Sequence, residues 1–153
     1  SKVFCLRENQ IYDIKKQKQL DKYEKLDVDE MKKYIDSLKD KKYEYENDDM
    51  PEISQLKNEV KLSSIKFIER VKKFNIELKS NVYLKIKNEN IKIVDGKEKD
   101  RHLYCYLDLR LLKRILHKKS HWNNALIGTH INFNRVPNKM DVDVETCMSF
   151  FHL

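Results

Sequence analysis

The chain has 153 residues, enough for one domain with its own core or for one domain and an extended arm. Lysine and arginine total 32 against 25 aspartate and glutamate, which gives a formal net charge of +7. The two signs are interleaved almost everywhere, as in KLDVDEMKKYIDSLKDKK, a pattern typical of solvated helix faces. A nucleic-acid stripe needs basic residues gathered on one face with few acids between them, so we expect only weak, salt-sensitive binding to duplex DNA.

The cysteines and the hydropathy of the chain indicate where in the cell the protein is located. Cys5, Cys105 and Cys147 are an odd number without CxxC spacing, and each lies among apolar neighbours. This pattern predicts buried, reduced thiols and a cytoplasmic location. No apolar run approaches the ~20 residues that span a bilayer, and no signal-peptide core is present. We therefore expect a soluble protein without a membrane span.

The first fifty residues are expected to form strands, a linker and a helix. Short apolar runs bounded by polar turns predict strands, and a charged stretch poor in apolar residues predicts the linker. Asp27 and Glu30 form a capping-box pattern before apolar residues at helical spacing. The expected elements are strands at 2–6 and 10–14, a linker at 15–26 and a helix at 27–46. Because the chain opens on a strand without a lead-in, we expect residues 1–50 to be the end of an upstream domain.

Residues 51–153 change between helical and alternating periods. Pro51 is expected in the first turn of a helix, which should pack as a pair with the helix before it. The expected elements are a helix at 52–74, a hairpin of strands at 82–86 and 91–95, a strand at 103–107, a helix at 109–119 capped by Asp108, a strand at 129–135 and a helix at 142–152. This order predicts an α+β domain with a mainly antiparallel sheet of four to five strands and packed helices.

A corner at 120–137 holds the only tryptophan of the chain, Trp122. Ser120 is expected to cap a short helical turn, and Gly128 to end it in the left-handed conformation. A large aromatic residue between a helix and a strand commonly joins two elements of one core. We therefore expect Trp122 to be buried and to have no catalytic role.

Two segments resemble known families. Residues 83–135, with the hairpin end IVDG and the helix YLDLRLLKRIL, resemble the second half of sterol-carrier-protein-type domains. The tail HWNNALIGTHINFNRVPNKMDVDVETCMSFFHL resembles the C-terminus of metallo-β-lactamase-fold hydrolases related to CMP-N-acetylneuraminate hydroxylases and sugar-lactone hydrolases. The positions that match this tail are Trp122, Asn123, Ala125, Ile127, Gly128, Phe133, Arg135, Pro137, Asp141 and Phe150.

The hydrolase resemblance implies a metal site outside this chain. The family binds its catalytic divalent metal through an HxHxDH motif, and the sequence has no such motif. The resemblance therefore implies a catalytic domain upstream in the same polypeptide, with residues 2–14 as its last strand and 27–46 as the helix that follows. No catalytic, cofactor-binding or metal-binding residue is then expected in the chain itself.

Several residue sets have a catalytic and a structural interpretation. His117 and His121, four residues apart, have the spacing of zinc ligands on one helix face, with His102 and His130 as further candidates, but two lysines follow His117 and would repel a cation. Cys105 could be a nucleophile, but its place in an alternating strand predicts a packed thiol. The acids Asp141, Asp143 and Glu145 resemble a cation site, and their place in the first turn of a helix explains them as capping residues.

Three functions follow from these observations. The first is a C-terminal accessory domain of a metallo-β-lactamase-fold, metal-dependent hydrolase. The second is a stand-alone binding module for an apolar small molecule or lipid, because sterol-carrier-type domains hold a pocket between sheet and helices. The third is a basic protein that binds nucleic acid or a protein partner, suggested by the charge and the eight tyrosines.

Overall fold

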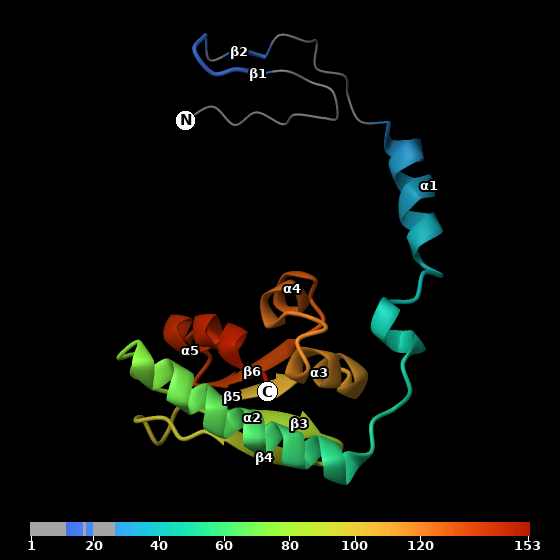
Figure 1. Ribbon diagram of the computed structural model, residues 1–153. Coiled ribbons are helices and arrows are strands. Elements are labelled where there is room, and N and C mark those ends of the chain that lie inside the picture. Colours follow the sequence, from blue (N-terminus) through green and yellow to red (C-terminus); the bar gives the residue numbers. More distant parts are fainter. Residues whose placement is uncertain (1–11, 17, 20–26) are drawn as a thin grey trace. The chain divides into compact units, whose positions relative to one another are not determined.

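The computed structural model describes residues 12–16, 18–19 and 27–153 (Figure 1). The chain divides into two compact units, residues 1–41 and residues 42–153, and each is described by itself. The expected strand at 2–6 and the first two residues of the one at 10–14 lie outside the described residues. No helix in the described part of the chain is both long enough and apolar enough to cross a membrane.

The first unit contains a short hairpin and one helix. Strand β1, Tyr12–Asp13, lies within the strand expected at 10–14 and pairs antiparallel with β2, Lys18–Gln19, which lies in the stretch expected to be a linker. Helix α1 is Val28–Leu38, and the Asp27 carboxylate caps it by accepting from the main-chain N–H of Asp29 at 2.8 Å. The helix was expected to continue to residue 46. It ends at Leu38 because the run KDKK that follows adds no apolar side chain, and α1 itself has no buried residue.

The second unit opens with a single turn of 3-10 helix and a long helix. The turn η1 is Glu44–Asn47, and α2 is Ile53–Lys73. The carboxylate of Glu52 caps α2, so Pro51 precedes the helix by two residues and does not lie in its first turn as expected. The hydrogen bond from the Ser54 hydroxyl lowers the pKa of Glu52 to about 2.

The buried face of α2 differs in part from the expected one. Leu56, Val60, Phe67 and Val71 are buried, with Ser63 between them. These positions lie four, three, four and four residues apart, a continuous helical stripe. From its approximate helical spacing Ile65 was expected on this face with the other apolar residues, but it falls outside the stripe and is 59% exposed.

Four strands form one mixed sheet. They are β3 (Asn81–Ile86), β4 (Glu89–Val94), β5 (His102–Tyr106) and β6 (Asn132–Val136). The order is β4-β3-β5-β6, with β3 parallel to β5 and the two outer pairings antiparallel. The predicted α+β class is confirmed, and two of the three strand pairings have the expected antiparallel direction.

The helices share one core with one face of the sheet. Strand residues that point into this core include Val82, Leu84, Ile86, Leu103 and Cys105. Helix α2 contacts β4 and α3, and Figure 1 shows it along β3 and β4. The other helices are α3 (Leu109–Leu116), α4 (Trp122–Ile127), α5 (Val142–Cys147) and the short 3-10 helix η2 (Met148–Phe150). The expected last helix is therefore shorter, since its final residues continue as η2 and an irregular end.

The corner at α4 confirms one expectation and corrects two. Trp122 is only 2% exposed, as predicted. Ser120 does not cap α4, because His121 occupies the cap position and offers no side-chain hydrogen bond. Gly128 has φ −74°, and Thr129 takes the left-handed conformation with φ 59°. The helix lasts one residue longer than expected, so the reversal falls on Thr129, and the His130 N–H then bonds the Ala125 carbonyl at 2.9 Å.

Candidate functional site

Within residues 42–153, the helices cover one face of the sheet and leave the other face to side chains of the strands alone. Alternation along each strand places aromatic, basic and amide residues on this second face. We name it the tyrosine face; its members are Tyr83, Lys85, Asn90, Lys92, His102, Tyr104, Tyr106, Asn132 and Asn134. The three tyrosines are half-buried, whereas the two lysines and three asparagines are exposed.

The register of the sheet aligns these residues in rows across the strands. Tyr83 pairs with Lys92 of β4 and with Tyr104 of β5, which in turn pairs with Asn134 of β6. The rings of Tyr83 and Tyr104 are stacked, with centroids 4.9 Å apart and planes 17° apart. The row therefore places a two-ring stack between a lysine on one side and an amide on the other.

A second row repeats this arrangement. Leu84 of β3 pairs with Cys105 of β5. The next residues along these parallel strands, Lys85 and Tyr106, are therefore neighbours on the tyrosine face. The Lys85 ammonium lies 5.4 Å from the centroid of the Tyr106 ring, within range of a cation–π contact. Tyr106 pairs on its other side with Asn132. Each of the two rings on β5 therefore has its β3 side occupied and its β6 side bordered by a short, exposed amide.

The charge of the tyrosine face is positive. Lys92 forms an ion pair with Asp95 at 2.7 Å and lies 5.8 Å from the Tyr83 ring. The hydrogen bond that Lys92 donates to the Asp95 carboxylate raises the pKa of Lys92. Lys85 makes no ion pair with any described residue. His102 lies at the end of the face, 6.2 Å from Tyr104 by ring centroids, and its buried Nδ1 has no hydrogen-bond partner among the described residues.

Two hollows lie on the helical side of this unit, around Arg114 of α3. One of about 470 Å³ is lined by Asn47, Asp48, Asp49, Arg110, Lys113, Arg114, His117 and Lys119. The other, of about 230 Å³, is lined by Tyr43, Glu44, Tyr45, Leu111, Arg114, Ser120, His121, Asn124, Ala125 and His130. Both are formed where the segment 43–49 lies against α3 and α4.

Ion pairs and hydrogen bonds hold the segment 43–49 in place. Arg114 donates to the Asp48 carboxylate at 2.5 and 2.9 Å and also pairs with Glu44 at 3.0 Å. This contact lowers the pKa of Asp48 and raises that of Arg114. Arg110 donates to the Glu46 carbonyl at 2.7 Å while Asp108 binds the same guanidinium. Since both arginines are neutralised by carboxylates, the hollows are explained as parts of a structural contact.

The histidines considered as metal ligands are not brought together as a set. His117 Nε2 lies 3.1 Å from the Glu59 carboxylate, and His130 Nδ1 lies 3.2 Å from the Tyr45 hydroxyl. His121 is exposed, and His102 belongs to the tyrosine face. In the described ranges no group of three or more His, Cys, Asp or Glu is placed to hold a metal ion.

Cys105 is a packed thiol, as its place in the strand predicts. Its side chain is fully buried in the core between the sheet and the helices. Burial raises the pKa of Cys105 far above its ordinary value, and the nearby Glu145 carboxylate adds to the effect. A thiolate nucleophile needs the opposite surroundings.

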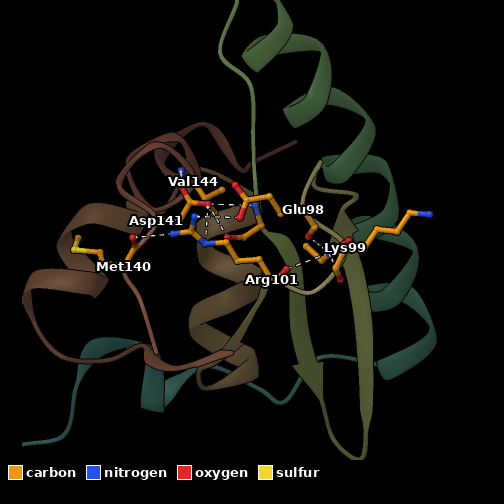
Figure 2. A network of polar contacts seen from close by, with 8 residues as sticks. Glu98, Lys99, Arg101, Met140, Asp141 and Val144 are labelled. Atoms are coloured by element: carbon orange, nitrogen blue, oxygen red, sulfur yellow. Dashed lines mark hydrogen bonds and ion pairs between the residues drawn. The ribbon is translucent and has the colours of Figure 1, made fainter. Parts of the chain in front are cut away.

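The acids at the start of α5 have structural partners. Asp141, 6% exposed, caps α5 and accepts hydrogen bonds from the Ser80 N–H at 3.1 Å and hydroxyl at 2.6 Å. Figure 2 shows Arg101 beside Asp141, with its guanidinium 3.9 Å from the carboxylate and donating to the Met140 carbonyl at 2.9 Å. The network joins the start of β3, the 95–101 loop and α5. Asp143 is exposed.

Glu145 forms the second polar contact between α5 and the sheet. The Arg135 guanidinium donates to both Glu145 oxygens at 2.8 Å, and the Glu145 side chain is 5% exposed. Arg135 also lies over the Phe133 ring, 5.1 Å from its centroid. The hydrogen bonds that Arg135 donates to Glu145 raise the pKa of Arg135. Sequence reasoning did not find this partner of Arg135.

The remaining positions of the tail have different environments. Ala125 is buried beside Trp122, whereas Asn123, Ile127 and Pro137 are exposed. Phe150 stacks on Phe74, with centroids 5.5 Å apart. The buried members therefore hold the domain together, and the exposed ones make no contact that explains their place in the resemblance.

Sequence reasoning missed the tyrosine face as a unit. The alternating pattern put Tyr83, Lys85, Tyr104 and Tyr106 on the outer side of their strands, which was the available signal. Their meeting depends on β5 lying beside β3, and no local pattern indicates this order. Comparisons with protein-family models, with curated proteins and with solved structures found no match, so the two family resemblances stay predictions.

Proposed function

We propose that residues 42–153 form a non-catalytic binding domain, the C-terminal accessory domain of a metal-dependent hydrolase of the metallo-β-lactamase fold. The observation that carries the binding role is the tyrosine face, a sheet surface that no helix of this unit covers. Tyrosine combines a large apolar ring with a hydroxyl at low entropic cost, and it is enriched where proteins bind partners. The divalent metal of the hydrolase would be bound upstream of this chain.

The surroundings of the candidate catalytic residues support a non-catalytic role. Cys105 has a raised pKa in the core, and Asp141 and Glu145 bind the protein's own serine, arginine and main chain. The arginines around the hollows are bound to Asp48 and Asp108. The exposed lysines and amides of the tyrosine face, with the rings between them, are available for a ligand.

The hydrolase part of the proposal is tested on the gene and on the longer protein. We expect the reading frame to continue upstream of Ser1 and to encode an HxHxDH motif. The longer polypeptide should purify with a divalent metal and hydrolyse a lactone or amide substrate. Residues 1–153 alone should hold no stoichiometric metal.

A matched variant checks the metal result. If residues 1–153 purify with one equivalent of zinc or iron, and the double substitution His117→Gln and His121→Gln removes it, the chain has its own metal site and the proposal is wrong. A reading frame that starts directly before Ser1, without the motif, contradicts the hydrolase part and leaves the binding role of the tyrosine face to be tested separately.

The lipid-binding alternative expects a pocket between the sheet and the helices, and the core there does not provide one. The sheet-facing helix residues meet a tightly filled core, with Val82, Leu84, Ile86 and Leu112 at 0% exposure. The larger of the two hollows described above is lined mainly by charged and polar side chains, which do not suit an apolar ligand.

A further inference from the structure

The tyrosine face combines three kinds of side chain that can bind a ligand. It has aromatic rings on adjacent strands, lysines that reach over those rings, and exposed amides along one side. The sheet therefore brings together, on one surface, aromatic, basic and amide residues that come from four separate segments of the sequence.

We propose that the tyrosine face binds single-stranded nucleic acid, with bases stacked against Tyr104 and Tyr106 and phosphates held by Lys85 and Lys92. The proposal rests on the binding role assigned to this face above and not on the hydrolase. It names the partner class by the chemistry that the face offers, which is stacking for flat rings and positive charge for a polyanion.

The rings have one side available for stacking. On β5, the β3 side of Tyr104 is covered by Tyr83, and Lys85 lies over the ring of Tyr106. On the β6 side, the register places only Asn134 and Asn132, which are short and exposed. A base that stacks on this side extends the existing two-ring stack, and the neighbouring amide can donate to and accept from the edge of the base.

The positive charge of the tyrosine face favours a polyanion over a partner with little negative charge. Lys85 has no acidic partner among the described residues, and Lys92 shares a single one, Asp95, which is exposed and competes only weakly with phosphate. Glu89, at the end of the hairpin, is bound to Lys57 of α2 at 2.6 Å. The face therefore keeps a net positive charge over its rings.

The geometry favours a single strand over a duplex. In a duplex the bases are stacked on one another, so rings that rise from an open sheet meet only the sugar–phosphate surface. Single strands expose bases that can stack on aromatic side chains, and this contact tolerates any sequence. We expect sequence-tolerant binding with a clear preference for the single strand.

The test measures binding of a fluorescein-labelled 15-nucleotide oligothymidylate to residues 1–153 by anisotropy, beside a 15-base-pair duplex of mixed sequence. Tyr104→Val and Tyr106→Val keep residues that suit a strand, and each should weaken single-strand binding by roughly 5- to 150-fold, the range of one base–aromatic stack. The double substitution Lys85→Gln and Lys92→Gln should lower the slope of log affinity against log salt by about 0.7 for each lysine.

The matched control removes the same charge from the other side of the domain. Lys61 and Lys66 are exposed on α2, so Lys61→Gln with Lys66→Gln should leave affinity and salt slope nearly unchanged. Circular dichroism verifies that every variant is folded. The inference is overturned if the oligonucleotide does not bind at low salt, if the duplex binds as tightly as the single strand, or if the control pair weakens binding as much as the Lys85 and Lys92 pair. None of these results bears on the upstream metal motif, so the two proposals fail separately.

Discussion

Replacement of Trp122 by alanine should remove the largest single contribution to the core of residues 42–153. Trp122 is 2% exposed, and its ring meets Phe151 edge to face with centroids 6.3 Å apart. A tryptophan buries on the order of 200 Å² of surface, which corresponds to about 5 kcal/mol of transfer free energy. Its Nε1–H has no partner among the described residues, and an unpaired buried donor costs about 1–3 kcal/mol.

The balance of these contributions predicts a loss of about 3–5 kcal/mol in the free energy of unfolding for Trp122→Ala, the usual range for a buried large aromatic. Trp122→Phe is the matched control. It keeps most of the ring and removes the unpaired donor, so we expect a cost of only about 1 kcal/mol. Urea unfolding followed by far-ultraviolet circular dichroism measures both, because the signal does not depend on tryptophan.

The wild-type protein gives an independent measure of the same environment. A buried indole should emit at short wavelength and resist quenching by iodide until the protein unfolds. If Trp122→Ala unfolds within about 1 kcal/mol of the wild type, and the wild-type emission is long-wavelength and fully quenched, the indole lies on the surface and the reasoning about the core is wrong.

Three further predictions concern single residues. Gly96→Ala should destabilise the domain strongly, because a Cβ there would lie 2.3 Å from the main-chain oxygen of Lys79. Gly128→Ala should cost less, because its Cβ would first meet the His130 side chain. Equal shifts in the melting temperature of the two variants would contradict this prediction. The pKa of His152 is held below its ordinary 6.5 by burial and by the cations Arg70, Lys118 and His121, so its stabilising contribution is complete above pH 6.5 and is lost as the pH falls through the lower folded value. His152→Asn should therefore flatten the dependence of stability on pH below about 6.5, and an unchanged profile would refute the assignment. In a Cys5→Ser variant, Cys105 and Cys147 should not react with a thiol reagent until the protein unfolds, because both thiols are buried and burial raises their pKa. Rapid reaction of either thiol in the folded protein would show that it is accessible.

Local patterns predicted most of the elements of the second unit. Alternation in VYLKI and LYCYL gave β3 and β5 with the correct inward residues, and Asp108 caps α3 as expected by accepting from the Arg110 N–H at 2.8 Å. These features depend on neighbours in the sequence, which a pattern can detect. The reversal after α4 was misplaced by one residue because Thr129, and not the glycine before it, takes the positive φ.

Features that depend on distant residues were not predicted. Residues 43–46 were expected to form the end of the first α-helix, yet Arg114 and Arg110 hold the segment 43–49, with its single 3-10 turn, from more than sixty residues away. The pairing of Arg135 with Glu145 and of Asp141 with Ser80 also depends on how α5 meets the sheet. The tyrosine face is the clearest case, because its rows exist only once β5 lies parallel to β3.

The most direct test of the binding role is a map of main-chain amide shifts in 15N-labelled residues 1–153 during titration with the oligothymidylate. The account predicts that the amides of Tyr83, Tyr104, Tyr106 and Asn134 shift together and saturate, while those of α2 and of the segment 43–49 stay in place. Shifts that centre on Arg114 and the two hollows, with none on the sheet, would contradict the account and move the binding site to the opposite side of the domain.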